Sequence, residues 1–86
     1  MESENRLQLE NLICNIVFLR KHFGISRKRM AKLLGIGVTT LQKLEQGILP
    51  PRLGVELFFH IQRNFGIAPV TILTRRLEDE EKIMPP

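Results

Sequence analysis

Apolar residues recur every three or four positions along the first quarter of the chain, which is the period of one helix face. They are Leu9, Leu12, Ile13, Ile16, Leu19 and Phe23. This spacing predicts a helix from about Asn5 to His22 that ends at Gly24. Asn5 is a candidate N-cap of this helix, and Gln8, three residues later, completes a capping pattern with it. Ser3 is the competing N-cap.

Two short helices joined by a tight turn are predicted next. Ser26 offers a side-chain oxygen to the free amides of a helix from Arg27 to Leu34. Gly35 can adopt the left-handed conformation that ends a helix, and Ile36 then fills the turn as a buried side chain. The inner face of this helix is expected to consist of Met30, Ala31 and Leu34.

The helix after the turn is predicted to run from Val38 to about Gln46 and to end at Gly47. Its inward residues are Leu41 and Leu44. The segment from Ile48 to Pro51 is expected to be a loop, because its two prolines lack amide donors and restrict the residues before them.

Two further helices complete the pattern. A fourth helix is predicted from about Leu53 to Asn64, ended by Gly66, on the apolar residues Leu57, Phe58, Ile61 and Phe65. A fifth begins near Pro69 and is expected to have an inner face of Val70, Leu73 and Leu77. We therefore expect an all-α chain, with one domain over residues 1–77 and a charged tail over residues 78–86 that is frayed or associated with a dimer.

Charge is distributed unevenly along the 86 residues, which have a formal net charge of +4 and a pI of about 9.8. Acidic residues gather at Glu2, Glu4 and from Glu78 to Glu81. Between Arg20 and Lys43 there is no Asp or Glu, and the basic residues are Arg20, Lys21, Arg27, Lys28, Arg29, Lys32 and Lys43. This distribution fits a polyanionic partner, and a solvated basic face is the alternative on charge alone.

The segment SRKRMAKLLGIGVTTLQKLEQG, residues 26–47, has the spacing that two steeply crossing short helices require. Ala31 supplies a small residue at the crossing, and Gly35 supplies the turn. The chain from about Leu19 to Leu73 resembles the phage-repressor or Cro-like helix-turn-helix family, also called the Xre family. The resemblance rests on Arg20, Ser26, Ala31, Gly35, Leu41, Leu44, Glu45 and Gly47.

This resemblance implies a compact five-helix, lambda-repressor-like domain whose helix from Val38 to Gln46 lies in the major groove of double-stranded DNA. The residues implied to read bases are Val38, Thr39, Gln42 and Lys43. Lys43 can donate to guanine and Gln42 can pair with adenine, while the methyl groups of Val38 or Thr39 can contact thymine. The residues expected to contact phosphates are Arg27, Lys28, Thr40, Gln46 and Arg52.

Arg20 and Glu45 match family positions that often form a partly buried ion pair, so we expect both to be structural. The chain departs from the family pattern at several positions, including Arg29 and Ala68, which suggests a divergent member. In addition, Arg27 stands where Gln is usual, Gly37 stands where a Ser or Thr cap is usual, and the loop from Ile48 to Pro51 is apolar rather than basic. These last three departures fall on the expected DNA-facing side.

Other chemistry finds little support in the sequence. Cys14 is expected to be a small buried residue, and His22 and His60 lack partners at metal-ligand spacing, so we expect no metal and no cofactor. There is no phosphate loop and no catalytic arrangement, so we expect no enzyme activity. The absence of a long apolar run and of a secretory pattern predicts a cytoplasmic, nucleoid-associated protein without membrane contact. No effector-binding segment is evident.

The expected function is sequence-specific DNA binding as a small transcriptional regulator, more often a repressor. A protein-protein adapter on the same fold is an alternative, with the loop from Ile48 to Pro51, Phe59 and Ile72 as candidate exposed residues, and a DNA-binding antitoxin is another. We expect a homodimer on a palindromic operator. The fifth helix and the tail are the candidate dimer surface, because Leu77, Ile83 and Met84 would otherwise be poorly covered.

Overall fold

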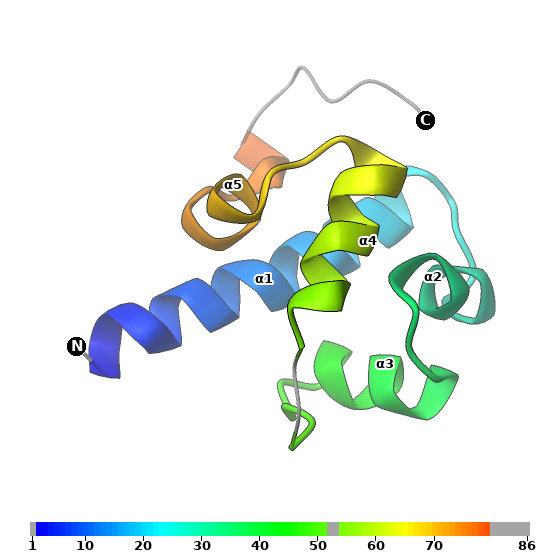
Figure 1. Cartoon of the computed structure of the whole chain (residues 1–86), viewed down its shortest axis with the longest axis horizontal. Helices are drawn as coiled ribbons and strands as arrows, with labels where there is room; N and C mark the ends of the chain where they lie inside the picture. The colour runs from blue at the N-terminus through cyan, green and yellow to red at the C-terminus, as the bar shows by residue number, and fades with distance from the viewer. Residues whose placement is uncertain (1, 52–53, 80–86) are drawn as a thin grey trace.

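The computed structural model describes residues 2–51 and 54–79, and within them the chain is all-helical (Figure 1). Five α-helices and one short 3-10 helix form in these ranges. They are α1 (Glu2–His22), α2 (Arg27–Leu34), α3 (Val38–Glu45), α4 (Val55–Phe65), α5 (Pro69–Thr74) and η1 (Leu77–Asp79). The all-α, five-helix prediction is confirmed. In these ranges no helix has the length and apolar character needed to cross a membrane.

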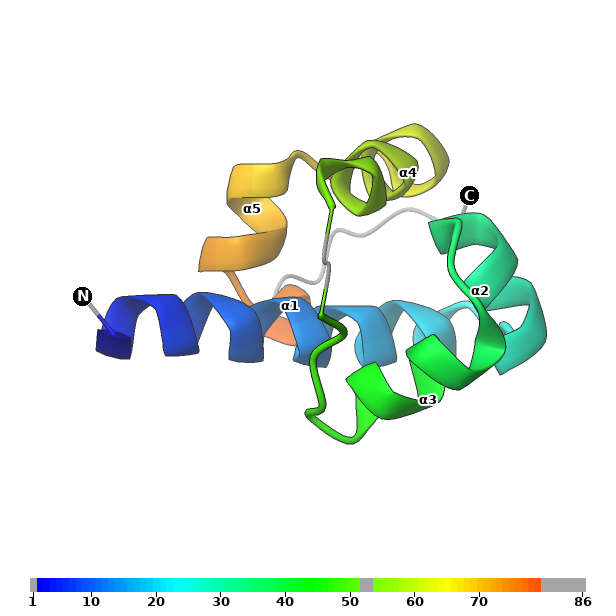
Figure 2. The same ribbon diagram turned by 60° about the horizontal axis from the view of Figure 1, so that its bottom comes forward.

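The long helix α1 supports the other elements. Figure 2 shows α4 and α5 on one side of α1 and α3 on the other, with α2 near its C-terminal end. The core between them consists mainly of aliphatic side chains that are almost fully buried: Leu12, Ile16, Leu19, Met30, Ala31, Leu34, Leu41, Leu57, Ile61, Ile72 and Leu77. This single core holds α2 and α3 against α1 and α4, which determines the orientation of α3.

The start of α1 differs from the sequence prediction. The helix begins at Glu2, so Asn5 and Ser3 lie inside it and neither is its cap. Its buried face is also rotated, because Asn11 and Asn15 are buried while Ile13 is only half-buried. Cys14 is exposed, so the prediction that it is buried is wrong.

Asn15 explains why polar residues can lie on the buried face of α1. Its Nδ2 donates to the carbonyl oxygens of Ile72 at 2.8 Å and Arg75 at 2.7 Å, and its Oδ1 accepts from the Leu77 amide at 2.9 Å. Asn11 Nδ2 donates to the Leu73 carbonyl at 2.8 Å. These bonds satisfy groups at the end of α5 that lack helical partners. The two asparagines therefore attach α5 and η1 to α1.

The C-terminal part of the fold required three corrections. Ile72 is buried rather than exposed, and Val70 is 66% exposed rather than on the inner face of α5. Leu77 is buried in η1, so it is not poorly covered as we expected. Because α5 has only six residues and ends at Thr74, the helical period that grouped Leu77 with Val70 and Leu73 does not continue to Leu77.

Other predicted boundaries shift slightly. The fourth helix runs Val55–Phe65 and is followed by Gly66 in a left-handed conformation, instead of running from about Leu53 to Asn64. The predicted domain boundary after Leu77 falls inside η1. Ile83 and Met84, the other two residues proposed for a dimer surface, lie outside the described residues.

Candidate nucleic-acid interface

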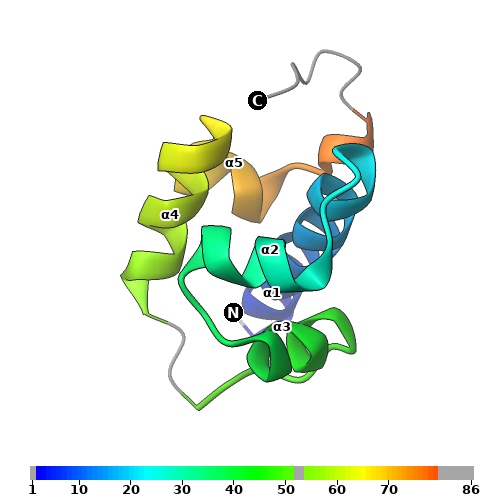
Figure 3. The same cartoon turned by 90° about the vertical axis from the view of Figure 1, so that its right-hand side faces the viewer.

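The turn between α2 and α3 forms as its sequence predicts. Ser26 Oγ accepts from the Arg29 amide at 3.2 Å and caps the start of α2. Gly35 ends α2 with φ +72°, a conformation that costs a residue with a Cβ about 1 to 2 kcal/mol. A Cβ at Gly35 would also lie 2.6 Å from Nε2 of His60, so α4 packs closely on the turn. Figure 3 shows α2 and α3 joined by this turn, with α4 beside it.

One face of α3 is open to solvent. Leu41 and Leu44 are fully buried and point inward. The four residues that the resemblance implies to read bases, Val38, Thr39, Gln42 and Lys43, are all exposed, together with Gln46. Thr40 is half-buried. Gly37 is the N-cap of α3 and provides no side-chain cap, as its lack of a side chain requires.

A charged cluster joins α3 to α1 and α2. Arg20 Nε and Nη2 donate to Glu45 Oε2 and Oε1 at 2.9 and 3.0 Å, which is a two-point ion pair. Arg27 Nε donates to the same Oε1 at 3.2 Å. The Glu45 side chain is 8% exposed and that of Arg20 is 14% exposed, whereas that of Arg27 is 52% exposed. The carboxylate of α3 is therefore turned inward, and the cation at the start of α2 remains partly open.

A polar groove lies beside this cluster. It has a volume of about 500 Å³ and is lined by Val17, Arg20, Lys21, Arg27, Gln42, Glu45 and Gln46. Gln42 belongs both to this groove and to the open face of α3, so the two features are continuous. Sequence reasoning assigned no contact to Lys21, although it lies in the basic stretch that the sequence shows. That Lys21 lies beside Arg27 depends on how α1 meets α2, which the local pattern does not specify.

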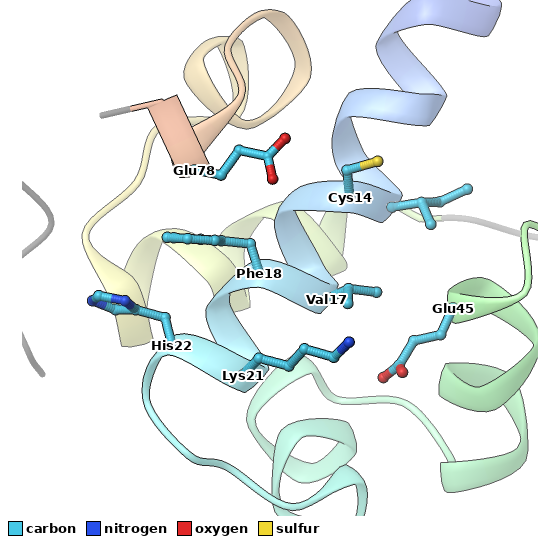
Figure 4. A pocket seen from close by; sticks show the side chains of 8 residues that line it. Cys14, Val17, Phe18, Lys21, His22, Glu45 and Glu78 are labelled. Atoms are coloured by element: carbon cyan, nitrogen blue, oxygen red, sulfur yellow. The ribbon is translucent and has the colours of Figure 1, made fainter. Parts of the chain in front are cut away.

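A second, more apolar groove runs along the outer side of α1. It is about 550 Å³ in volume, and Figure 4 shows Cys14, Val17 and Phe18 on α1 between Glu45 of α3 and Glu78 of η1. Cys14 is the one sulfur-containing side chain labelled in Figure 4. In residues 2–51 and 54–79, no group of three or more His, Cys, Asp or Glu side chains could hold a metal ion. This groove offers a hydrophobic surface rather than a reactive centre.

One protein-family model matches the part of the chain that contains α2 and α3. Residues 18–58, from the last part of α1 to the first turn of α4, match the family model described as Helix-turn-helix. This part of the chain is similar to the helix-turn-helix family. The match confirms the resemblance to phage-repressor-like proteins. Searches of curated proteins and of solved structures gave no significant match.

The helix-turn-helix family is one of DNA-binding transcription regulators and is generally non-enzymatic. The two helices joined by the tight turn, α2 and α3, both lie within the matched residues. In the loop after α3, Ile48 and Leu49 are 51% and 40% exposed. Arg52, a predicted phosphate contact in that loop, lies outside the described residues.

Proposed function

We propose that this protein is a sequence-specific transcriptional regulator, most simply a repressor, that places α3 in the major groove of double-stranded DNA. The observation that carries this proposal is the composition of the open face of α3. It presents methyl, hydroxyl, amide and ammonium groups, and the one carboxylate of the helix, Glu45, is withdrawn to Arg20. A face without exposed negative charge suits a polyanion.

The proposed base contacts follow from the chemistry of the exposed side chains. Lys43 donates to the O6 and N7 acceptors of guanine, and Gln42 forms a paired contact with adenine. The methyl groups of Val38 and Thr39 contact thymine methyls. Each well-formed contact of this kind discriminates against a wrong base by about 1 to 3 kcal/mol.

The proposed phosphate contacts surround α3. Arg27 and Lys28 lie in the first turn of α2, whose N-terminal dipole also favours an anion. Thr40 and Gln46 extend the set along α3, and Arg52 is the candidate from the following loop. Contacts of this kind position the protein on the duplex without reading its sequence.

A homodimer on a palindromic operator is part of the proposal. The eight residues of α3 span about 12 Å, so one copy reads only a few base pairs and two copies double the contacts. The burial of Leu77 removes it from the proposed dimer surface, whereas Val70 of α5 is available. Sedimentation equilibrium with and without duplex DNA tests this part, and a chain that stays monomeric in both conditions contradicts it.

An adapter function is supported by the exposure of Ile48 and Leu49 and by that of Phe59, which was expected to be exposed and is 58% exposed. DNA binding and adapter binding predict opposite sensitivities. Replacing Lys28 and Lys43 by alanine abolishes the proposed DNA binding and leaves an apolar adapter surface intact, whereas Leu49→Asp has the reverse effect.

The proposed function is tested by fluorescence anisotropy with a mixed-sequence duplex. We expect binding at about 50 mM salt whose association constant falls steeply as salt rises, by about 0.9 log units per log unit of salt for each phosphate neutralised. No binding at low salt, or binding that is independent of salt, contradicts the proposal.

A further inference from the structure

The polar groove at the junction of α1, α2 and α3 has features of an anion site. Its lining includes three cations, Arg20, Lys21 and Arg27, and one carboxylate, Glu45, which leaves an excess of two positive charges. We propose that this groove holds a DNA backbone phosphate between Lys21 of α1 and Arg27 of α2. This inference rests on the proposed function and adds α1 to the DNA-contacting surface.

The three cations have different roles because their hydrogen bonds differ. Arg20 uses Nε and Nη2 on Glu45 and is largely buried, so it contributes charge rather than a contact. Arg27 uses Nε on Glu45 at 3.2 Å and is half-exposed, which leaves the other edge of its guanidinium for an outside ligand. Glu45 therefore holds Arg27 in place at the groove.

Lys21 is the exposed cation that α1 contributes to the lining of the groove. Its ammonium group has no ion-pair or hydrogen-bond partner in the part of the chain that the structure describes, and Figure 4 shows its side chain extending along α1 on the side of Glu45. The lysine of α1 and the guanidinium anchored at the start of α2 line the same groove and can contact the same phosphate.

The position of the groove indicates that its phosphate belongs to a duplex. Gln42 of α3 and Gln46, which follows the last residue of α3, line the groove, and Gln42 is also one of the proposed base-reading residues. An anion in the groove therefore lies next to the base edges that α3 reads, where a duplex presents its backbone. The contact would set the register of α3 in the major groove.

The test compares Lys21→Gln with a matched control, Lys32→Gln. Both lysines are exposed and lie in the last turn of a helix, Lys21 in α1 and Lys32 in α2, so both substitutions remove a favourable charge from a helix C-terminus. Only Lys21 lines the groove. Circular dichroism confirms that each variant is folded, and anisotropy with the mixed-sequence duplex gives the salt dependence of binding.

We expect Lys21→Gln to lower the salt slope by about one phosphate, so that its loss of affinity between about 50 and about 200 mM salt is about three- to fourfold smaller than that of the wild type. Lys32→Gln should keep the wild-type slope, and Lys21→Arg should restore it. Equal slopes for Lys21→Gln and Lys32→Gln overturn the inference while leaving DNA binding intact. If the wild type itself fails to bind, the proposed function fails first.

A site for a small phosphate ligand is distinguished from a site for a DNA backbone phosphate by a titration without DNA. Inorganic phosphate is added to the protein, and backbone amide NMR shifts are followed. We expect no saturable shift around Lys21 and Arg27 at millimolar phosphate, because the geometry of the duplex supplies the remaining contacts. Saturable binding that Lys21→Gln abolishes, together with an unchanged salt slope on DNA, assigns the groove to a small phosphate ligand and contradicts the duplex assignment.

Discussion

Arg20 and Glu45 form a two-point ion pair that fastens α3 to α1, with nitrogen-oxygen distances of 2.9 and 3.0 Å. The same carboxylate also holds Arg27 at the start of α2. One acidic residue thus links three helices and keeps negative charge off the open face of α3. The pair is structural in its contacts, and it also shapes the proposed DNA-binding surface.

Removing Glu45 should be more costly than removing the pair. In Glu45→Gln the largely buried Arg20 loses its counter-charge, and we expect the free energy of unfolding to fall by about 2 to 4 kcal/mol. The double variant Arg20→Met with Glu45→Leu should lose less, because no unpaired charge remains in a mostly buried position. Urea denaturation of Arg20→Met, Glu45→Leu and their double variant measures the coupling energy. Strictly additive losses would show that the pair contributes no coupling.

Asn15 should be among the most sensitive polar positions of the fold. Asn15→Ala leaves two carbonyl groups and the Leu77 amide without their partners, and each unpaired buried group costs about 1 to 3 kcal/mol. We expect the free energy of unfolding, measured by urea titration, to fall by about 2 kcal/mol or more, which corresponds to about one to two such groups. Asn5→Ala, at an exposed position of the same helix, is the control and should change stability little. A small effect at Asn15 would mean that water replaces these bonds.

The turn between α2 and α3 permits a matched comparison of two glycines. Gly35 and Gly66 both follow a helix with positive φ, 72° and 68°, but only Gly35 contacts another side chain, that of His60. Gly66→Ala should cost about 1 kcal/mol for its backbone conformation alone. Gly35→Ala should cost more, and adding His60→Ala should recover the difference. Equal melting-temperature shifts for the two alanine variants would contradict the close packing of His60 on the turn.

The helix-turn-helix could be predicted from the sequence because its determinants are local. Ser26, Gly35 and the inward Leu41 and Leu44 specify a capped helix, a left-handed turn and a second helix without reference to the rest of the chain. The departure of Arg27 from the family pattern can also be seen in the sequence. Its hydrogen bond to Glu45 cannot, because that contact depends on how α2 and α3 are placed in three dimensions.

The parts that sequence reasoning missed depend on long-range partners. Polar residues such as Asn11 and Asn15 are ordinarily expected on the exposed face of a helix. They are buried here because α5 and η1, more than 50 residues later, supply carbonyl and amide partners. In the same way Cys14 is exposed because the buried face of α1 is rotated toward the asparagines. Leu77 could not be placed from the helical period because α5 stops after six residues and Leu77 lies in the separate element η1.

The central claim is that α3 reads base pairs, and selection of bound sequences from random duplex DNA tests it most directly. The selection is performed with the wild type and with Lys43→Ala, each at several salt concentrations. We predict one enriched site for the wild type, and for Lys43→Ala loss of preference at a guanine position with other positions retained, worth about 1 to 3 kcal/mol of discrimination. If no sequence is enriched, or if Lys43→Ala enriches the same site with the same preference at every position, α3 does not read DNA in the way we propose.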